Sequence, residues 1–139
     1  MQVQGAVDLA STVQRLFAAL RRTSPPGLSL TAASTLSILD ADGPLRLTEL
    51  AAREGVTQPA MTQLVTRLER DALASRRPSP QDGRVVLVEI TAAGRELLHH
   101  RRRLRADVVT SLMAELPAAD RKAIEAALPA LDRLASLVP

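Results

Sequence analysis

The stretch from Leu47 to Ile90 constrains the fold most, because its apolar spacing changes from that of helices to that of strands. Spacings of three and four, which are typical of helices that bury one face, connect Leu47, Leu50, Ala51, Val56, Met61, Leu64, Val65 and Leu68. From Arg84 to Ile90, Val and Leu fall on both faces of an expected strand. The stretch therefore predicts two short helices followed by a β-ribbon.

Capping and turn residues indicate where these helices begin and end. Thr48 and Thr57 each precede a helical pattern, and a Thr hydroxyl suits an N-cap, where it accepts a hydrogen bond from a first-turn amide. Gly55 lies between the two patterns, where a residue free to adopt positive φ closes a tight turn. We expect helices over residues 48–54 and 58–71, arranged as a helix-turn-helix.

A β-ribbon is expected directly after the second of these helices. Residues 73–77 lead in, residues 78–83 form the tip, and residues 84–90 lead out. The tip carries Asp82-Gly83, a turn dipeptide, in a loop longer than two residues. Residues 45–47 form a short extended piece that could supply a third strand. A helix-turn-helix with such a wing beside it has a shape suited to gripping duplex DNA.

The flanks of this stretch have helical patterns. We expect helices over residues 7–22, 30–39 and 91–115, the third of them capped by Thr91, and a last helix from about residue 117 that Pro129 should kink or divide. The Ser24-Pro25-Pro26-Gly27 run should end the first helix. The terminal helices carry more Leu and Val than one small domain needs to cover, so a second copy of the chain is the simplest partner. The fold class is mainly α with a small β-ribbon (α+β).

Composition narrows the choice of partner. Phe17 is the only aromatic residue, which argues against single-stranded nucleic-acid binding by base stacking. Between Arg67 and Arg105 arginines outnumber acidic residues, which indicates a polyanionic partner, such as double-stranded DNA. A plain solvated helix face is the alternative for Arg101 to Arg105.

An enzyme is not expected. The 139-residue chain has no Cys, no Gly-rich phosphate loop and no His-Glu-x-x-His spacing, so we expect neither a catalytic site nor a cofactor. His99 and His100 are adjacent on an expected helix and point about 100° apart, so no metal site is expected there. No apolar segment is long enough to span a membrane, and the N-terminus has no basic-then-apolar leader, so the expected location is cytoplasmic.

The pattern resembles the MarR family of bacterial regulators over nearly the whole chain. The residues that carry the resemblance are Leu68-Glu69, Leu73, Arg76, Asp82-Gly83-Arg84 and Thr91-Ala92-Ala93-Gly94. Two features depart from the family pattern. Ala72 stands where Gly is usual, so the helix before it should end differently, and the tip residues Pro78-Ser79-Pro80-Gln81 carry less charge than usual, so fewer phosphate contacts follow.

The resemblance implies a DNA-binding repressor that acts as a homodimer on a pseudo-palindromic operator. Residues 31–90 would form the winged helix-turn-helix domain, and residues 1–30 with 91–139 the helical dimerisation region. A small lipophilic or phenolic effector would bind a cleft lined by Leu16, Phe17, Leu36 and Leu39, although these residues also fit an ordinary core.

The chemistry of the residues agrees with this implication. The helix expected over residues 58–71 would enter the major groove, and its polar face carries Gln58, Thr62, Gln63, Thr66 and Arg67. Gln and Arg side chains make paired hydrogen bonds to adenine and guanine edges. Thr48 and Thr57, with Arg76 and Arg77, are candidates for phosphate contacts.

The wing, residues 78–84, would place Arg84 in the minor groove, with Asp82 bracing its guanidinium. Three alternatives stay open. Gln63 and Thr66 also fit a solvated helix surface, and Asp82 with Arg84 also fits a simple hairpin ion pair. The whole domain also fits a winged-helix module that binds protein and has no specific DNA site.

Overall fold

The computed structural model describes residues 1–22 and 27–137. It contains two compact units, one formed by residues 24–103 and the other by residues 1–23 together with residues 104–139. Helix α5 (Ala92–Ala114) continues from the first unit into the second. The break expected at Ser24-Pro25-Pro26 lies outside the described residues.

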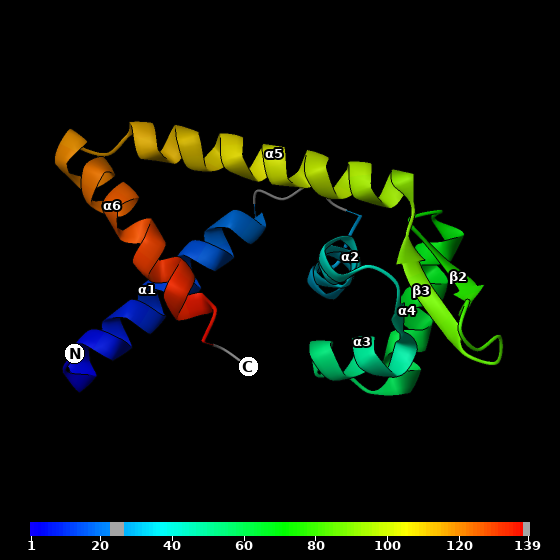
Figure 1. The fold of residues 1–139 in the computed structure, drawn as a ribbon. Coiled ribbons are helices and arrows are strands. Elements are labelled where there is room, and N and C mark those ends of the chain that lie inside the picture. The colour runs from blue at the N-terminus through cyan, green and yellow to red at the C-terminus, as the bar shows by residue number, and fades with distance from the viewer. Residues whose placement is uncertain (23–26, 138–139) are drawn as a thin grey trace. The chain divides into compact units, whose positions relative to one another are not determined.

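The unit of residues 24–103 is a winged helix-turn-helix (Figure 1). Its elements are α2 (Leu30–Asp42), β1 (Leu45–Arg46), α3 (Leu47–Glu54), α4 (Gln58–Arg70), β2 (Ala74–Pro78), β3 (Val86–Ile90) and the first part of α5. The three strands form an antiparallel sheet in the order β1-β3-β2. Leu45 and Arg46 pair with Val88 and Leu87, so the short extended piece is the third strand, as predicted. The fold class predicted from the sequence is confirmed.

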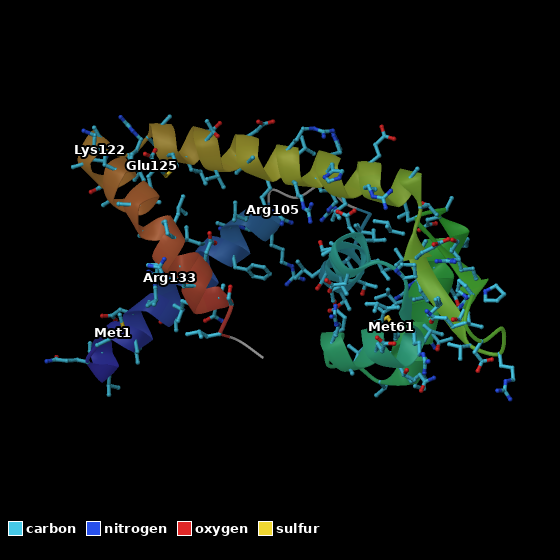
Figure 2. The ribbon with its side chains drawn as sticks, in the orientation of Figure 1. Met1, Met61, Arg105, Lys122, Glu125 and Arg133 are labelled. Atoms are coloured by element: carbon cyan, nitrogen blue, oxygen red, sulfur yellow. The ribbon has the colours of Figure 1, made fainter. Side chains whose placement is uncertain are left out.

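The core of this unit lies where the three short helices meet the inner face of the sheet. Leu36 and Leu39 come from α2, Leu50 from α3 and Val88 from β3, and all four are almost fully buried. Met61 of α4, labelled in Figure 2, belongs to the same cluster and is also fully buried. Burial of one such side chain contributes roughly 1.5–3 kcal/mol, so the helix-turn-helix is held by its apolar stripes.

Helix α4 ends in a left-handed residue although that residue is Ala72. Its φ is 60°, and no other non-glycine residue in the described ranges has a positive φ. The amide of Ala72 donates to Glu69 O at 2.9 Å, and the amide of Leu73 donates to Leu68 O at 2.8 Å. This pair of bonds defines the Schellman ending of a helix, in which glycine is usual. The expectation that α4 would end differently is therefore wrong, because both amide bonds form despite the strain at the Cβ.

The second unit contains α1 (Val3–Arg22), the last part of α5, and α6 (Ala118–Ala135). Neither α1 nor α6 has a buried residue. The exposed large apolar side chains here include Val7, Val13, Leu16, Phe17, Leu112, Ile124, Leu128, Leu131 and Leu134. Helix α6 is one element through Pro129, because a proline removes one amide donor and keeps a helical φ. Of the two expected effects the division is therefore wrong, and the kink stays a prediction.

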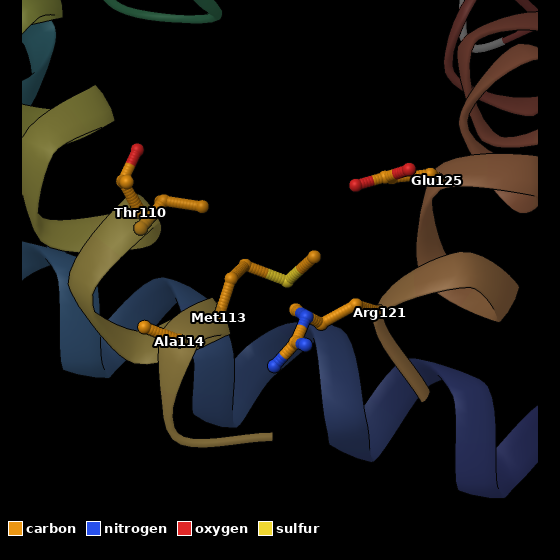
Figure 3. A pocket seen from close by; sticks show the side chains of 6 residues that line it. Thr110, Met113, Ala114, Arg121 and Glu125 are labelled. Atoms are coloured by element: carbon orange, nitrogen blue, oxygen red, sulfur yellow. The ribbon is translucent and has the colours of Figure 1, made fainter. Parts of the chain in front are cut away.

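An open hollow lies between the end of α5 and the start of α6. It has a volume of about 580 Å³ and is lined by Val109, Thr110, Met113, Ala114, Arg121 and Glu125. Figure 3 shows Thr110 and Met113 reaching into it from α5, with Arg121 and Glu125 opposite on α6. The guanidinium of Arg121 donates to the carbonyl of Leu116, which follows the end of α5. The hollow therefore combines an apolar floor with one cation and one carboxylate.

Candidate nucleic-acid interface

Thr57 and Gly55 set the start of α4. Gly55 has a left-handed backbone with φ 65°, and its amide donates to Ala51 O and Ala52 O, so it ends α3 and turns the chain. Thr57 then caps α4, because its hydroxyl accepts a hydrogen bond from Ala60 N at 3.3 Å. Both roles were predicted from the sequence, and both are confirmed.

Thr48 does not cap α3, which is a correction. Helix α3 begins at Leu47, its N-cap residue is Arg46, and no side chain accepts a hydrogen bond at this end. The physical reason is the pairing of Arg46 with Leu87, which keeps the backbone extended up to Arg46 and lets the helix begin directly after it. Thr48 is exposed in the first turn of α3, a position from which its hydroxyl can still meet a phosphate.

Helix α4 divides into one apolar and one polar face. Its four apolar residues Met61, Leu64, Val65 and Leu68 are all buried. The polar residues predicted to contact DNA are Gln58, Gln63, Thr66 and Arg67, which are exposed, and Thr62, which is half-buried. The structure thus presents to solvent the side chains that the sequence assigned to the groove-facing side of this helix.

The two threonine hydroxyls of α4 are already used as donors. Thr62 donates to Gln58 O at 2.9 Å, and Thr66 donates to Thr62 O at 2.8 Å. Each hydroxyl keeps lone pairs and can accept a hydrogen bond, but its proton is engaged within the helix. Among the residues of α4 predicted to contact bases, the side-chain donors are therefore the two glutamines and Arg67.

The wing is a hairpin with a long, locally closed tip. Ser79 N donates to Val85 O at 2.7 Å, and Val85 N donates to Asp82 O at 3.0 Å. Ser79 is buried, and its hydroxyl accepts a hydrogen bond from Gln81 N at 3.3 Å. The tip keeps its shape through these bonds although it has few charged residues.

Arg84 projects from this tip and is braced by Asp82. The Nε of Arg84 lies 3.2 Å from Asp82 Oδ1, and the guanidinium side chain is 92% exposed. The amide of Arg84 donates to the same carboxylate oxygen at 3.1 Å. This amide bond first, and then the bond from the guanidinium, hold the pKa of Asp82 below its ordinary value, so the carboxylate stays charged.

Arg46 is a cation near this site that the sequence reasoning missed. Its charge also lowers the pKa of Asp82, which places it within electrostatic reach of the wing. Arg46 lies on β1, paired with Leu87 of β3, and its own carboxylate contact is a loose one at 3.9 Å from Glu49. The sequence did contain a hint of this position, because residues 45–47 were expected to be extended. A strand there that pairs with β3 brings Arg46 close to the wing.

Arg76 and Arg77 lie on opposite faces of β2, and each has a carboxylate partner. Arg76 pairs with Glu69 of α4, and its Nη2 lies 3.4 Å from Thr66 Oγ1. Arg77 Nε lies 2.9 Å from Glu89 Oε2 of the neighbouring strand. Their predicted part in binding phosphate stays a prediction, but neither guanidinium extends freely into solvent.

The basic block of α5 is partly used within the fold. Arg95 Nε lies 2.9 Å from Asp40 Oδ1 of α2, and Arg102 Nη1 lies 3.8 Å from the other carboxylate oxygen. Arg101 is buried, whereas Arg103 and its neighbour Arg102 are exposed. The alternative of a plain solvated helix face therefore holds for only part of the run from Arg101 to Arg105.

Sequence comparison places this geometry among known proteins. The family model described as the MarR family matches residues 28–86. An HTH-type transcriptional regulator of Mycobacterium bovis is 35% identical over 123 residues, which are 88% of this chain and 86% of that protein. A Mycobacterium leprae protein described in the same way is 39% identical over 101 residues, 72% of this chain and 71% of its own. The chain belongs to the MarR family.

Solved structures of transcription regulators share this fold. The transcriptional regulator BldR from Sulfolobus solfataricus is 26% identical and superposes with a TM-score of 0.70, covering 99% of this chain and 100% of that one. A MarR family protein from Bacillus stearothermophilus has a TM-score of 0.78 over 98% and 99% of the two chains; at 19% identity it shows the fold alone. This protein is therefore a DNA-binding transcription regulator with a winged helix-turn-helix, and not an enzyme.

The four residues assigned to an effector cleft have two different environments. Leu36 and Leu39 are almost fully buried in the core of the winged unit, which is the alternative that the sequence left open for them. Leu16 and Phe17 lie on α1, where their exposed fractions are 57% and 52%. Only the second pair offers side-chain surface to a ligand or a partner.

Residues 1–22 and 27–137 contain neither a metal-binding cluster nor a membrane-spanning helix. Within those ranges, no three His, Asp or Glu side chains are grouped so that they could hold a metal ion, and His99 and His100 are both exposed. None of the helices is both long enough and apolar enough to cross a membrane.

Proposed function

We propose that this MarR-family regulator is a homodimeric repressor that binds a pseudo-palindromic operator. The observation that carries the proposal is the pairing of a polar, exposed face on α4 with an exposed, braced Arg84 on the wing. A helix in the major groove and an arginine in the adjacent minor groove would together read one half-site. Occupation of a promoter by the dimer would then block transcription.

Helix α4 is the proposed recognition helix. Gln58, Gln63 and Arg67 would donate to base edges, because amide and guanidinium groups can form paired bonds with adenine and guanine. Thr62 and Thr66 would act as acceptors, since their protons are bound within the helix. Thr48 and Thr57 at the helix starts would meet phosphates, and these contacts would fix the register of the domain without reading sequence.

The wing would contribute charge at a single exposed position. Arg84 would enter the minor groove, where a narrow A·T-rich stretch has the most negative potential. Asp82 holds the guanidinium from one side through its carboxylate, which limits the directions that Arg84 can take. Arg46 lies close enough to influence Asp82 and would add a cation at the base of the wing.

A second copy of the chain is the proposed partner of the terminal helices. The support is their exposed apolar surface, which includes Val109 at the hollow beside α6 and the stripe of Ile124, Leu128 and Leu131 along it. Apolar patches of this kind on a small protein mark interaction surfaces. We therefore assign dimerisation to residues 1–30 and 91–139, and DNA binding to residues 31–90.

Release of the operator by a small lipophilic or phenolic effector is the proposed mode of control. Such a molecule would act by binding better to a dimer whose recognition helices do not fit successive major grooves. Leu16 and Phe17 are the candidate contacts, because Leu36 and Leu39 are enclosed in the core. We expect the protein to act in the cytoplasm, where a bacterial operator would be found.

The test is selection of binding sites from random duplex DNA with the purified full chain, repeated with the double variant Gln63→Ala/Arg84→Ala. We expect the wild-type protein to enrich an inverted repeat with half-sites about one helical turn, roughly 34 Å, apart. The double variant should lose this enrichment. If both proteins enrich nothing, the winged unit is a protein-binding module, and the proposal is wrong.

A further inference from the structure

Arg76 occupies the inner face of the wing sheet, where its neighbours are apolar. Directly across the sheet its partner is Val88, and two residues earlier on the same strand is Ala74; both are buried. Paired residues, and residues two apart on a strand, share one face of the sheet. Arg76 therefore points toward the side that packs against α4, and only 29% of its side chain is exposed.

The guanidinium of Arg76 reaches two points on the recognition helix. One terminal nitrogen donates to Glu69 Oε1, and the other lies 3.4 Å from Thr66 Oγ1. The hydroxyl of Thr66 in turn donates to the carbonyl of Thr62, one turn earlier in α4. The side chain of Arg76 on β2 thus connects the strand that leads into the wing to two successive turns of α4.

We propose that Arg76 is a positioning residue, which holds α4 in register with the wing through Glu69 and Thr66 and does not neutralise a DNA phosphate. The proposal rests on the function proposed above, since it concerns how that site is assembled. Each terminal nitrogen of Arg76 makes one contact with α4. Turning the guanidinium toward a phosphate would leave the Glu69 carboxylate, itself 70% covered, without its counter-charge.

The contact of Arg76 with Glu69 and Thr66 matters because α4 must enter the major groove while Arg84 enters the minor groove. The polar side chains of α4 and Arg84 of the wing can both reach the DNA only if helix and hairpin keep a fixed relative position. The half-buried pair between Arg76 and Glu69 is screened less than a fully exposed one. Specific binding needs both α4 and the wing, whereas non-specific binding needs only cations near phosphates. Loss of the contact between Arg76 and Glu69 should therefore weaken specific binding more.

Three variants test the proposal by their operator affinity, their affinity for a random duplex and their salt dependence. Arg76→Met removes the positive charge, whereas Arg76→Lys keeps the charge but loses the two terminal nitrogens of the planar guanidinium. Glu69→Gln removes the negative charge and keeps the shape of the side chain. We expect all three to weaken operator binding by about tenfold. In none of the three variants should binding to a random duplex become weaker, and neither Arg76→Met nor Arg76→Lys should change the slope of log Kd against log salt.

Glu69→Gln is the decisive variant because the two accounts predict opposite signs. Removal of a negative charge from α4 should strengthen DNA binding on electrostatic grounds alone, and more so if it released Arg76 for a phosphate. The positioning role predicts weaker operator binding instead. A double variant, Glu69→Gln/Arg76→Met, should bind no more weakly than the poorer single variant, because the two residues act through one contact.

Arg133→Met is the matched control, because it removes the same positive charge as Arg76→Met. Arg133 is exposed on α6 and lies on the side of that helix opposite Ile124. Far-ultraviolet circular dichroism establishes that each variant is folded, and if Arg76→Met fails to fold, Arg76→Lys and Glu69→Gln carry the test. The proposal is overturned if Arg76→Met reduces the salt slope by about one while Arg76→Lys and Glu69→Gln bind the operator normally or more tightly. A wild-type protein that binds no duplex would instead overturn the proposed function.

Discussion

The carbonyl oxygen of Leu73 occupies the space where a side chain on Gly94 would begin. A Cβ built on Gly94 would lie 2.1 Å from that oxygen and 2.9 Å from a side-chain carbon of Ile90. Thr91 completes the junction, because its amide donates to Leu73 O at 3.1 Å and its hydroxyl to Ala72 O at 2.6 Å. The end of α4 and the start of α5 are therefore joined backbone to backbone.

Gly94→Ala should destabilise the winged unit. The carbonyl of Leu73 would have to move, and we expect the free energy of unfolding to fall by about 1–3 kcal/mol, the usual range for forcing extra atoms into a packed region. This loss opposes the gain in helix propensity that alanine normally brings. Urea unfolding followed by circular dichroism measures the change. Gly83→Ala is the control, since nothing lies within 4 Å of a Cβ there, and equal losses in both variants would contradict the account.

Ala72→Gly should stabilise the protein. Glycine adopts the left-handed conformation without the strain that Ala72 bears at φ 60°, so the free energy of unfolding should rise by up to about 1 kcal/mol. Ala72→Val should lower it, because a β-branched residue is poorly tolerated at positive φ. Thermal unfolding of the three proteins orders them, and a glycine variant less stable than wild type would show that Ala72 is unstrained.

Thr57→Ala should cost more stability than Thr48→Ala. Only Thr57 accepts a cap hydrogen bond, and its removal should lower the free energy of unfolding by about 0.5–1 kcal/mol, the lower part of the range for lost N-caps. Thr48 has no cap bond to lose, so its variant should unfold like the wild-type protein. Urea unfolding compares the two, and equal midpoints for the two variants would count against the assignment of α4's cap.

Asp82 should titrate below the ordinary range of an aspartate, because the amide of Arg84 and then its guanidinium stabilise the charged form. A folded-state pKa below the unfolded one means that this interaction stabilises the fold at neutral pH and is lost as the pH falls through the folded-state pKa. In Arg84→Ala the amide remains, so the pKa should rise only part of the way. Carboxyl carbon shifts in an NMR titration report both values. An Asp82 that titrates normally in the wild-type protein would contradict the brace.

Much of the fold could be predicted because the apolar stripes alone determine which faces are buried. Met61 and Val65 recur at helical spacing, and they lie in the core for that reason. The helix-turn-helix, the wing and the capping role of Thr57 follow from such local patterns. Thr48 failed as a cap because its helix start depends on pairing with β3, a contact distant in sequence.

The sequence predicted which residues belong to the candidate site better than it predicted their hydrogen-bond and ion-pair partners. Polar residues off the apolar stripe of α4 had to be exposed, so Gln63 and Arg67 were found. The partners of Arg76 and Arg77 depend on the alternation of faces along β2 and on which helix covers the sheet, and spacing alone does not give them. Leu36 and Leu39 were ambiguous for the same reason, because an apolar side chain can line either a cleft or a core.

The central claim is that α4 and the wing bind duplex DNA through charge and base contacts, and the salt dependence of binding tests it most directly. A duplex carrying the selected inverted repeat would be titrated with the full-length protein at several salt concentrations. The account predicts a steep fall in affinity, with log Kobs against log salt having a slope on the order of −5, as counterions leave the phosphates that the dimer contacts. A flat dependence, or equal affinity for the inverted repeat and a random duplex, would contradict it.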